Sequence, residues 1–164
     1  MNSYVVLLLA YAQIAATLTG FIGVVSVLGD RSKGRPDTSE SAAVFHLLLS
    51  ALGALFLSLF AALLLVLLAT DEHLAWRIAN GLSGCVHLIG ASHLAVETWR
   101  QENGLQAALV PIAIGMTTAF ASIAAAAGYL PRAEVLVFML ATLWALCITV
   151  ISFVSLLIAA RRVK

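Results

Sequence analysis

The fold of this chain is decided by residues 47–68, LLLSALGALFLSLFAALLLVLL, which contain two serines and no charged residue. A helix that crosses the hydrocarbon core of a bilayer, about 30 Å thick, needs roughly 20 mostly apolar residues. Leucine and alanine favour helix, and the stretch lacks the strict alternation of a membrane β-strand. It therefore predicts a membrane-spanning helix.

The composition of the whole chain points the same way. Its 164 residues are 62% hydrophobic and only 10% charged, with a mean hydropathy of +1.05. A soluble domain has about 25% charged residues, so an ordinary soluble enzyme and a disordered chain are both excluded. The net charge of +1 lacks the basic excess of a nucleic-acid-binding protein. We expect an integral membrane protein whose main partner is the lipid bilayer.

Four further segments are long and apolar enough to be interpreted as spans. The third is the weakest, because it contains several polar side chains. Together the spans use most of the chain and predict an all-α, five-span helical bundle that forms a single transmembrane domain over residues 1–164. The predicted spans cover about residues 4–28, 42–69, 74–96, 107–128 and 134–160.

The basic residues predict the orientation. Seven of the nine fall in the first loop, the third loop and the C-terminal tail, which lie on one side of a five-span protein. Because cytoplasmic loops carry the excess of Lys and Arg, we expect the N-terminus outside and the C-terminus in the cytoplasm. Tyr4, Trp76 and Tyr129 then fall near the outer membrane interface, where aromatic side chains are enriched.

The third span contains a stripe of polar residues, Arg77, Asn80, Ser83 and His87, that share one helical sector at 100° per residue. Polar groups inside a membrane are functional candidates, so the stripe could line a pore or a wet cavity or form a partner interface. Alternatively, Arg77 extends to the interface and His87 is neutral with one hydrogen-bond partner. Two polar residues of the first span could face this stripe and form one seam with it, namely Gln13 and Thr17.

A second group of candidate residues lies near the predicted cytoplasmic side. His46 and His93 fall at similar depth on neighbouring spans, and Glu97 and Glu40 lie close to the same level. Two such histidines could ligate haem b, and histidine with carboxylates could bind zinc or iron. Alternatively, His93 and Glu97 form a local hydrogen-bonded pair. No established metal motif accompanies these residues.

Small residues recur along three of the spans and allow helices to approach closely. These faces could pack inside the bundle, or one of them could contact a second copy and form a homo-oligomer. The candidate packing residues are Ala16, Gly20 and Gly23 in the first span, Ala54 and Ser58 in the second and Gly115 in the fourth.

Several short motifs carry a resemblance to known sequences: AYAQIAATLTGFIGVV at 10–25, LGDRS at 28–32, AWR at 75–77 and AAGYL at 126–130. In these motifs the chain resembles a group of small uncharacterised proteobacterial membrane proteins. The resemblance implies a multi-pass protein of the bacterial inner (cytoplasmic) membrane and implies no activity.

The sequence shows no nucleophile–base pair, phosphate-binding loop or carboxylate dyad. We therefore expect a small non-enzymatic membrane protein that self-associates. It would act as a channel or transport-like pore, or as a scaffold that binds other membrane subunits. The alternative is a haem b- or metal-binding redox subunit that uses His46 and His93.

Overall fold

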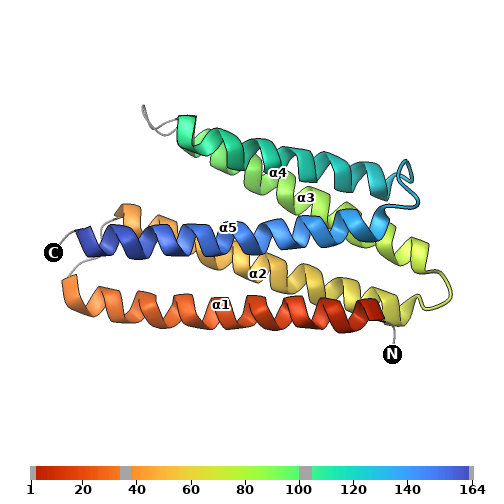
Figure 1. Ribbon diagram of the computed structural model, residues 1–164, viewed down its shortest axis with the longest axis horizontal. Helices are drawn as coiled ribbons and strands as arrows, with labels where there is room; N and C mark the ends of the chain where they lie inside the picture. The colour runs from red at the N-terminus through yellow and green to blue at the C-terminus, as the bar shows by residue number, and fades with distance from the viewer. Residues whose placement is uncertain (1–2, 34–37, 100–104, 163–164) are drawn as a thin grey trace. The chain divides into compact units, whose positions relative to one another are not determined.

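A computed structural model describes residues 3–33, 38–99 and 105–162 of the chain (Figure 1). All regular structure in these ranges is α-helical, which confirms the all-α prediction. The five helices are α1 (Ser3–Lys33), α2 (Thr38–Leu67), α3 (Glu72–Trp99), α4 (Leu105–Ala126) and α5 (Glu134–Arg162).

Four of the helices are long and apolar enough to cross a membrane within the part of the chain that the structure describes. Their spanning segments are Ser3–Val24, Leu47–Leu67, Leu109–Ala126 and Glu134–Val154. Helix α3 has 28 residues and is long enough, but its polar side chains make it the least apolar of the five. The structure therefore confirms four helices that are long and apolar enough to span a membrane, whereas the fifth span and the orientation of the termini stay predictions.

The chain divides into two compact units. The first contains Met1–Leu59 and Ala145–Lys164, and the second contains Phe60–Trp144. Helices α2 and α5 each continue from one unit into the other, so the boundary does not fall in a linker. The single domain predicted over residues 1–164 stays a prediction.

In the first unit, apolar side chains of α1, α2 and α5 form two buried clusters. The rings of Phe21 and Phe153 meet edge to face at 5.4 Å and connect α1 to α5. A polar contact joins α2 to α5, where the Thr149 hydroxyl lies 2.9 Å from the Ser50 hydroxyl and 2.8 Å from the carbonyl of Ala145. The buried members of the clusters are Ile22, Leu47, Ala51 and Phe153 in one and Ala15, Ala54 and Leu146 in the other.

The small residues predicted to pack on α1 lie mostly beside the positions that this helix buries. The buried positions include Ala12, Ala15 and Ile22, whereas Ala16 and Gly20 are exposed. A Cβ atom added at Gly20 or Gly23 would meet nothing within 4 Å. Ala16 and Gly20 therefore make no close packing contact among the described residues, and the alternative that this face contacts a second copy stays a prediction. On α2, by contrast, the predicted packing residues Ala54 and Ser58 are buried.

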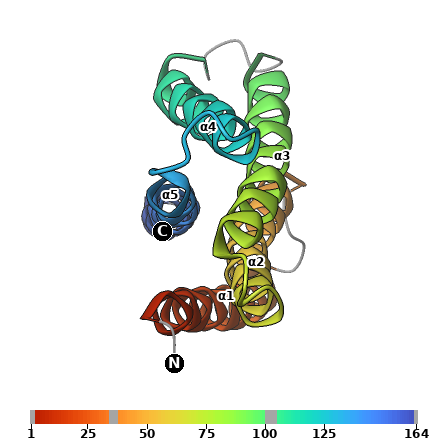
Figure 2. The ribbon, with the colours of Figure 1, turned by 90° about the vertical axis from the view of Figure 1, so that its right-hand side faces the viewer.

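In the second unit, α3 and α4 lie side by side and antiparallel (Figures 1 and 2). Glycines permit the close approach. A Cβ atom at Gly84 would lie 3.2 Å from the carbonyl oxygen of Ala119 and 2.7 Å from a side-chain carbon of Ile123. Near the other end of the contact, a Cβ atom at Gly115 would lie 3.1 Å from that of Ala91, so Gly115 packs as predicted.

We expect Gly84→Leu to lower the free energy of unfolding by about 1–3 kcal/mol or more, because the new side chain would collide with the backbone of α4. The measurement is thermal unfolding in mild detergent, followed by circular dichroism. The matched control is Gly90→Leu on the same helix, where an added Cβ atom meets nothing within 4 Å. Equal melting temperatures for the two variants would contradict the α3–α4 contact.

Candidate functional site on α3

The polar stripe of α3 faces the neighbouring helices of the second unit rather than open space. Asn80 and Ser83 are completely buried, and His87 is partly buried. Arg77, at the N-terminal end of the stripe, is exposed. The structure thus places the four predicted residues along one side of α3, and each of them has at least one described hydrogen-bond contact.

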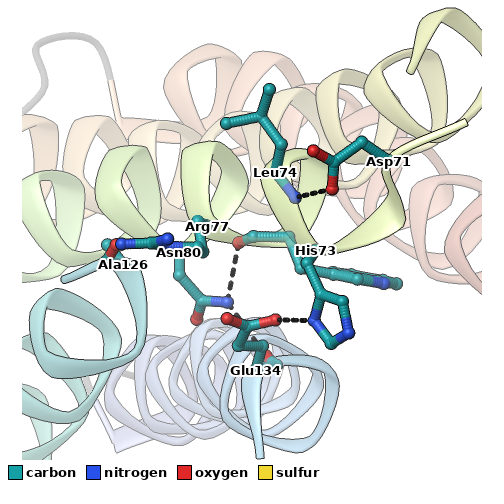
Figure 3. A network of polar contacts seen from close by, with 8 residues as sticks. Asp71, His73, Leu74, Arg77, Asn80, Ala126 and Glu134 are labelled. Carbon is teal, nitrogen blue, oxygen red and sulfur yellow. Dashed lines mark hydrogen bonds and ion pairs between the residues drawn. The ribbon is translucent and has the colours of Figure 1, made fainter. Parts of the chain in front are cut away.

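Asn80 connects α3 to the first turn of α5. Its side-chain nitrogen Nδ2 donates to the carbonyl oxygen of Trp76 in its own helix and to that of Glu134 in α5, each at 2.9 Å (Figure 3). Both hydrogens of the amide group are therefore used. Because Asn80 is fully buried, these bonds offset the cost of removing the amide from water.

His87 makes a second connection between α3 and α5. Its Nε2 atom lies 3.0 Å from the carbonyl oxygen of Ala141, and its Nδ1 atom lies 2.8 Å from that of Ser83. The Ser83 hydroxyl lies 3.4 Å from the same Nδ1 atom. A neutral imidazole carries one N–H, so it donates to one carbonyl at a time. In either tautomer the ring bonds to backbone, which agrees with the alternative that His87 is a hydrogen-bonded packing residue.

Arg77 caps the end of α4. Its Nε atom donates to the carbonyl oxygen of Ala126 at 2.9 Å. Helix α4 ends at Ala126, and the turn that follows contains Gly128, which has φ +85°. A Cβ atom at Gly128 would lie 2.9 Å from the Arg77 guanidinium. A positive φ favours glycine, and a cation at a helix C-terminus is stabilised by the helix dipole. Arg77 therefore has a structural partner and does not simply extend toward the interface.

An ion pair beside the stripe was not predicted from the sequence. The Nδ1 atom of His73, before the predicted third span, lies 2.9 Å from a carboxylate oxygen of Glu134 at the start of α5 (Figure 3). The His73 side chain is 76% exposed and the Glu134 side chain 4%. The Glu134 carboxylate raises the pKa of His73, first because it accepts a hydrogen bond from the imidazole and then through its negative charge, with smaller contributions from Asp71 and Glu72. Both residues adjoin the predicted outer ends of spans, which is the signal that could have paired them.

Trp76, which is predicted near the outer membrane interface, packs within the second unit. It is 2% exposed, and its ring lies 5.7 Å from that of Phe138 in α5. Its depth in the membrane stays a prediction. Tyr4 and Tyr129 are exposed.

The polar residues predicted on α1 belong to the first unit. Gln13 and Thr17 are exposed, and the Thr17 hydroxyl donates to the backbone carbonyl of Gln13 at 2.8 Å. The seam predicted between these residues and α3 stays a prediction.

The haem or metal hypothesis concerns residues that the structure describes only in part. His93 is exposed on α3, whereas the side chains of Glu40, His46 and Glu97 lie outside the described residues. Among the described residues, no group of three His, Cys, Asp or Glu side chains could hold a metal ion. The use of His46 and His93 as ligands stays a prediction, and a Soret band in the purified protein would establish that haem binds.

No protein-family model, curated protein or solved structure matches this sequence. The resemblance to uncharacterised proteobacterial membrane proteins therefore stays a prediction. The described contacts of the stripe are made to backbone carbonyls of α3, α4 and α5. The one exception among them is the contact between the Ser83 hydroxyl and His87.

The His73–Glu134 pair predicts a pH-dependent stability. Because the folded protein raises the pKa of His73, the stabilisation is fully present below the ordinary value of 6.5 and is lost as the pH rises through the raised pKa. We expect His73→Gln to lower the melting temperature near pH 6 and to have a smaller effect near pH 9. The measurement is thermal unfolding across this range, with His93→Gln near the other end of α3 as the control. A His73→Gln effect that grows with pH would contradict the ion pair.

Proposed function

We propose that this chain is a small non-enzymatic protein of the bacterial inner membrane that self-associates and serves as a scaffold subunit of a membrane complex. In this proposal it crosses the membrane five times, with its N-terminus outside and its C-terminus in the cytoplasm. The observation that carries the scaffold assignment is the use of the α3 polar stripe for packing between helices.

The antiparallel packing of α3 on α4 supports the fifth span. Arg77 contacts Ala126 at one end of the pair, and Ala91 contacts Gly115 toward the other. Helix α4 is apolar and long enough to cross a membrane. A helix that follows it over this length would lie at the same depth. Two of the polar side chains that lower the hydropathy of α3, Asn80 and Ser83, are buried against its neighbours.

The contacts of the stripe favour a scaffold over a pore. A pore would leave polar side chains facing a continuous aqueous path. Here Asn80 and Ser83 are fully buried, and Asn80 and His87 bond to carbonyls of α5. These bonds hold α5 against α3, which is the function of polar residues in many membrane helix contacts.

The exposed face of α1 supports self-association. Gln13 lies midway along the segment Ser3–Val24, and among the described residues its carboxamide has no hydrogen-bond partner. An amide in hydrocarbon is costly unless it is bonded, and the amide of a second copy supplies both a donor and an acceptor. The open positions Ala16 and Gly20 beside it would let two α1 helices approach closely.

We expect Gln13→Leu and Gly20→Leu to weaken self-association. Loss of one interhelical hydrogen bond in a membrane costs about 1–2 kcal/mol, which is roughly 5- to 30-fold in the dissociation constant. The measurement is native mass spectrometry or crosslinking in mild detergent, with Ile14→Leu and Gly90→Leu as controls. A wild-type protein that is only monomeric would contradict self-association.

The scaffold assignment has a separate test. We expect liposomes that contain the purified protein to retain entrapped ions and protons as well as protein-free liposomes do. Selective flux that His87→Leu abolishes would contradict the scaffold and establish the channel alternative.

A further inference from the structure

Two oxygen atoms in the second unit are buried without a hydrogen-bond partner among the described residues. They are the side-chain oxygen Oδ1 of Asn80 and the hydroxyl oxygen of Ser122 on α4. Both residues are 0% exposed. Leaving such an acceptor or hydroxyl unpaired costs about 1–3 kcal/mol, so each requires an explanation.

The packing register places the two residues at the same level. Ala119 and Ala126, one turn on either side of Ser122, contact α3 at Gly84 and Gly81. Asn80 lies next to Gly81 and contacts the start of α5 at Glu134. Ser122, buried on α4, therefore faces the same interior between α3, α4 and the first part of α5.

A further buried hydroxyl lies close to Asn80 along α3. Ser83 is 0% exposed and lies about one turn after Asn80 on the same helix. Its hydroxyl is 3.4 Å from Nδ1 of His87. The two groups that still need partners thus come from two helices, and a third polar side chain lies near one of them.

We propose that a water molecule binds here and bridges Oδ1 of Asn80 to the hydroxyl of Ser122, with the Ser83 hydroxyl as a third partner. A buried water is retained where two to four polar groups can bond to it, and this interior supplies that number. The water donates one hydrogen to Asn80, whose Nδ2 group is already committed to two carbonyls. The site would complete the hydrogen bonding of the stripe and would act independently of self-association.

The test uses the direction of a stability change. If water bridges the two groups, Ser122→Ala removes one of its partners and lowers the melting temperature of the full chain in mild detergent. If the interior is dry, the same substitution removes an unpaired hydroxyl and leaves the melting temperature unchanged or raises it. The control is Thr117→Ala, which removes an exposed hydroxyl of α4 that bonds only to the carbonyl of its own Ala113.

An experimental structure that resolves ordered waters provides the second measurement. We expect a density peak at hydrogen-bond distance, about 2.7–3.2 Å, from both Oδ1 of Asn80 and the hydroxyl oxygen of Ser122. The peak should be missing in Ser122→Ala and present in Thr117→Ala. Side-chain rotamers that pair both atoms directly with protein groups would overturn the proposal.

Discussion

The structure depends on one constraint, which is that α3 carries polar side chains into an apolar protein. An amide or imidazole without a partner is costly in lipid or in a packed interior. The described contacts pair the Nδ2 group of Asn80 and the ring of His87 with backbone carbonyls of α3 and α5. Because backbone carbonyls occupy fixed positions on a helix, these bonds also set the register of α3 against α5. The polar side chains that look like a functional site in the sequence therefore include those that hold α5 against α3.

The same constraint accounts for the ends of the helices. Arg77 bonds to the last turn of α4, where carbonyls have no partner within the helix, and the turn that follows requires glycine at 128. Glu134 is buried at the N-terminus of α5, where the helix dipole favours a negative charge, and it pairs with His73. Charged groups at this end therefore complete helix termini, which is consistent with a structural function for the cluster.

The apolar runs predicted the helices well, because hydropathy and length are local properties of the sequence. The 100° spacing also placed Arg77, Asn80, Ser83 and His87 on one face. Their partners could not be predicted, since backbone carbonyls of α4 and α5 carry no signature in the sequence. The part of the small-residue face of α1 that is buried could not be predicted for a related reason, because Ala12 and Ala16 are both small and only contacts with other helices decide which is buried. His73 and Glu134 could have been paired from topology alone.

We propose that the α3 stripe is packed between helices and does not line an aqueous path. Its most direct test is thiol labelling in a lipid bilayer, in a background where Cys85 and Cys147, both exposed in the structure, are replaced by alanine. Single cysteines are introduced at Ser83 and His87, with Tyr129→Cys, a position 81% exposed beside the end of α4, as the reactive reference. If the stripe is packed between helices, a charged maleimide labels Tyr129→Cys quickly and leaves Ser83→Cys and His87→Cys unmodified. Labelling of the two stripe positions at the rate of the reference would contradict it.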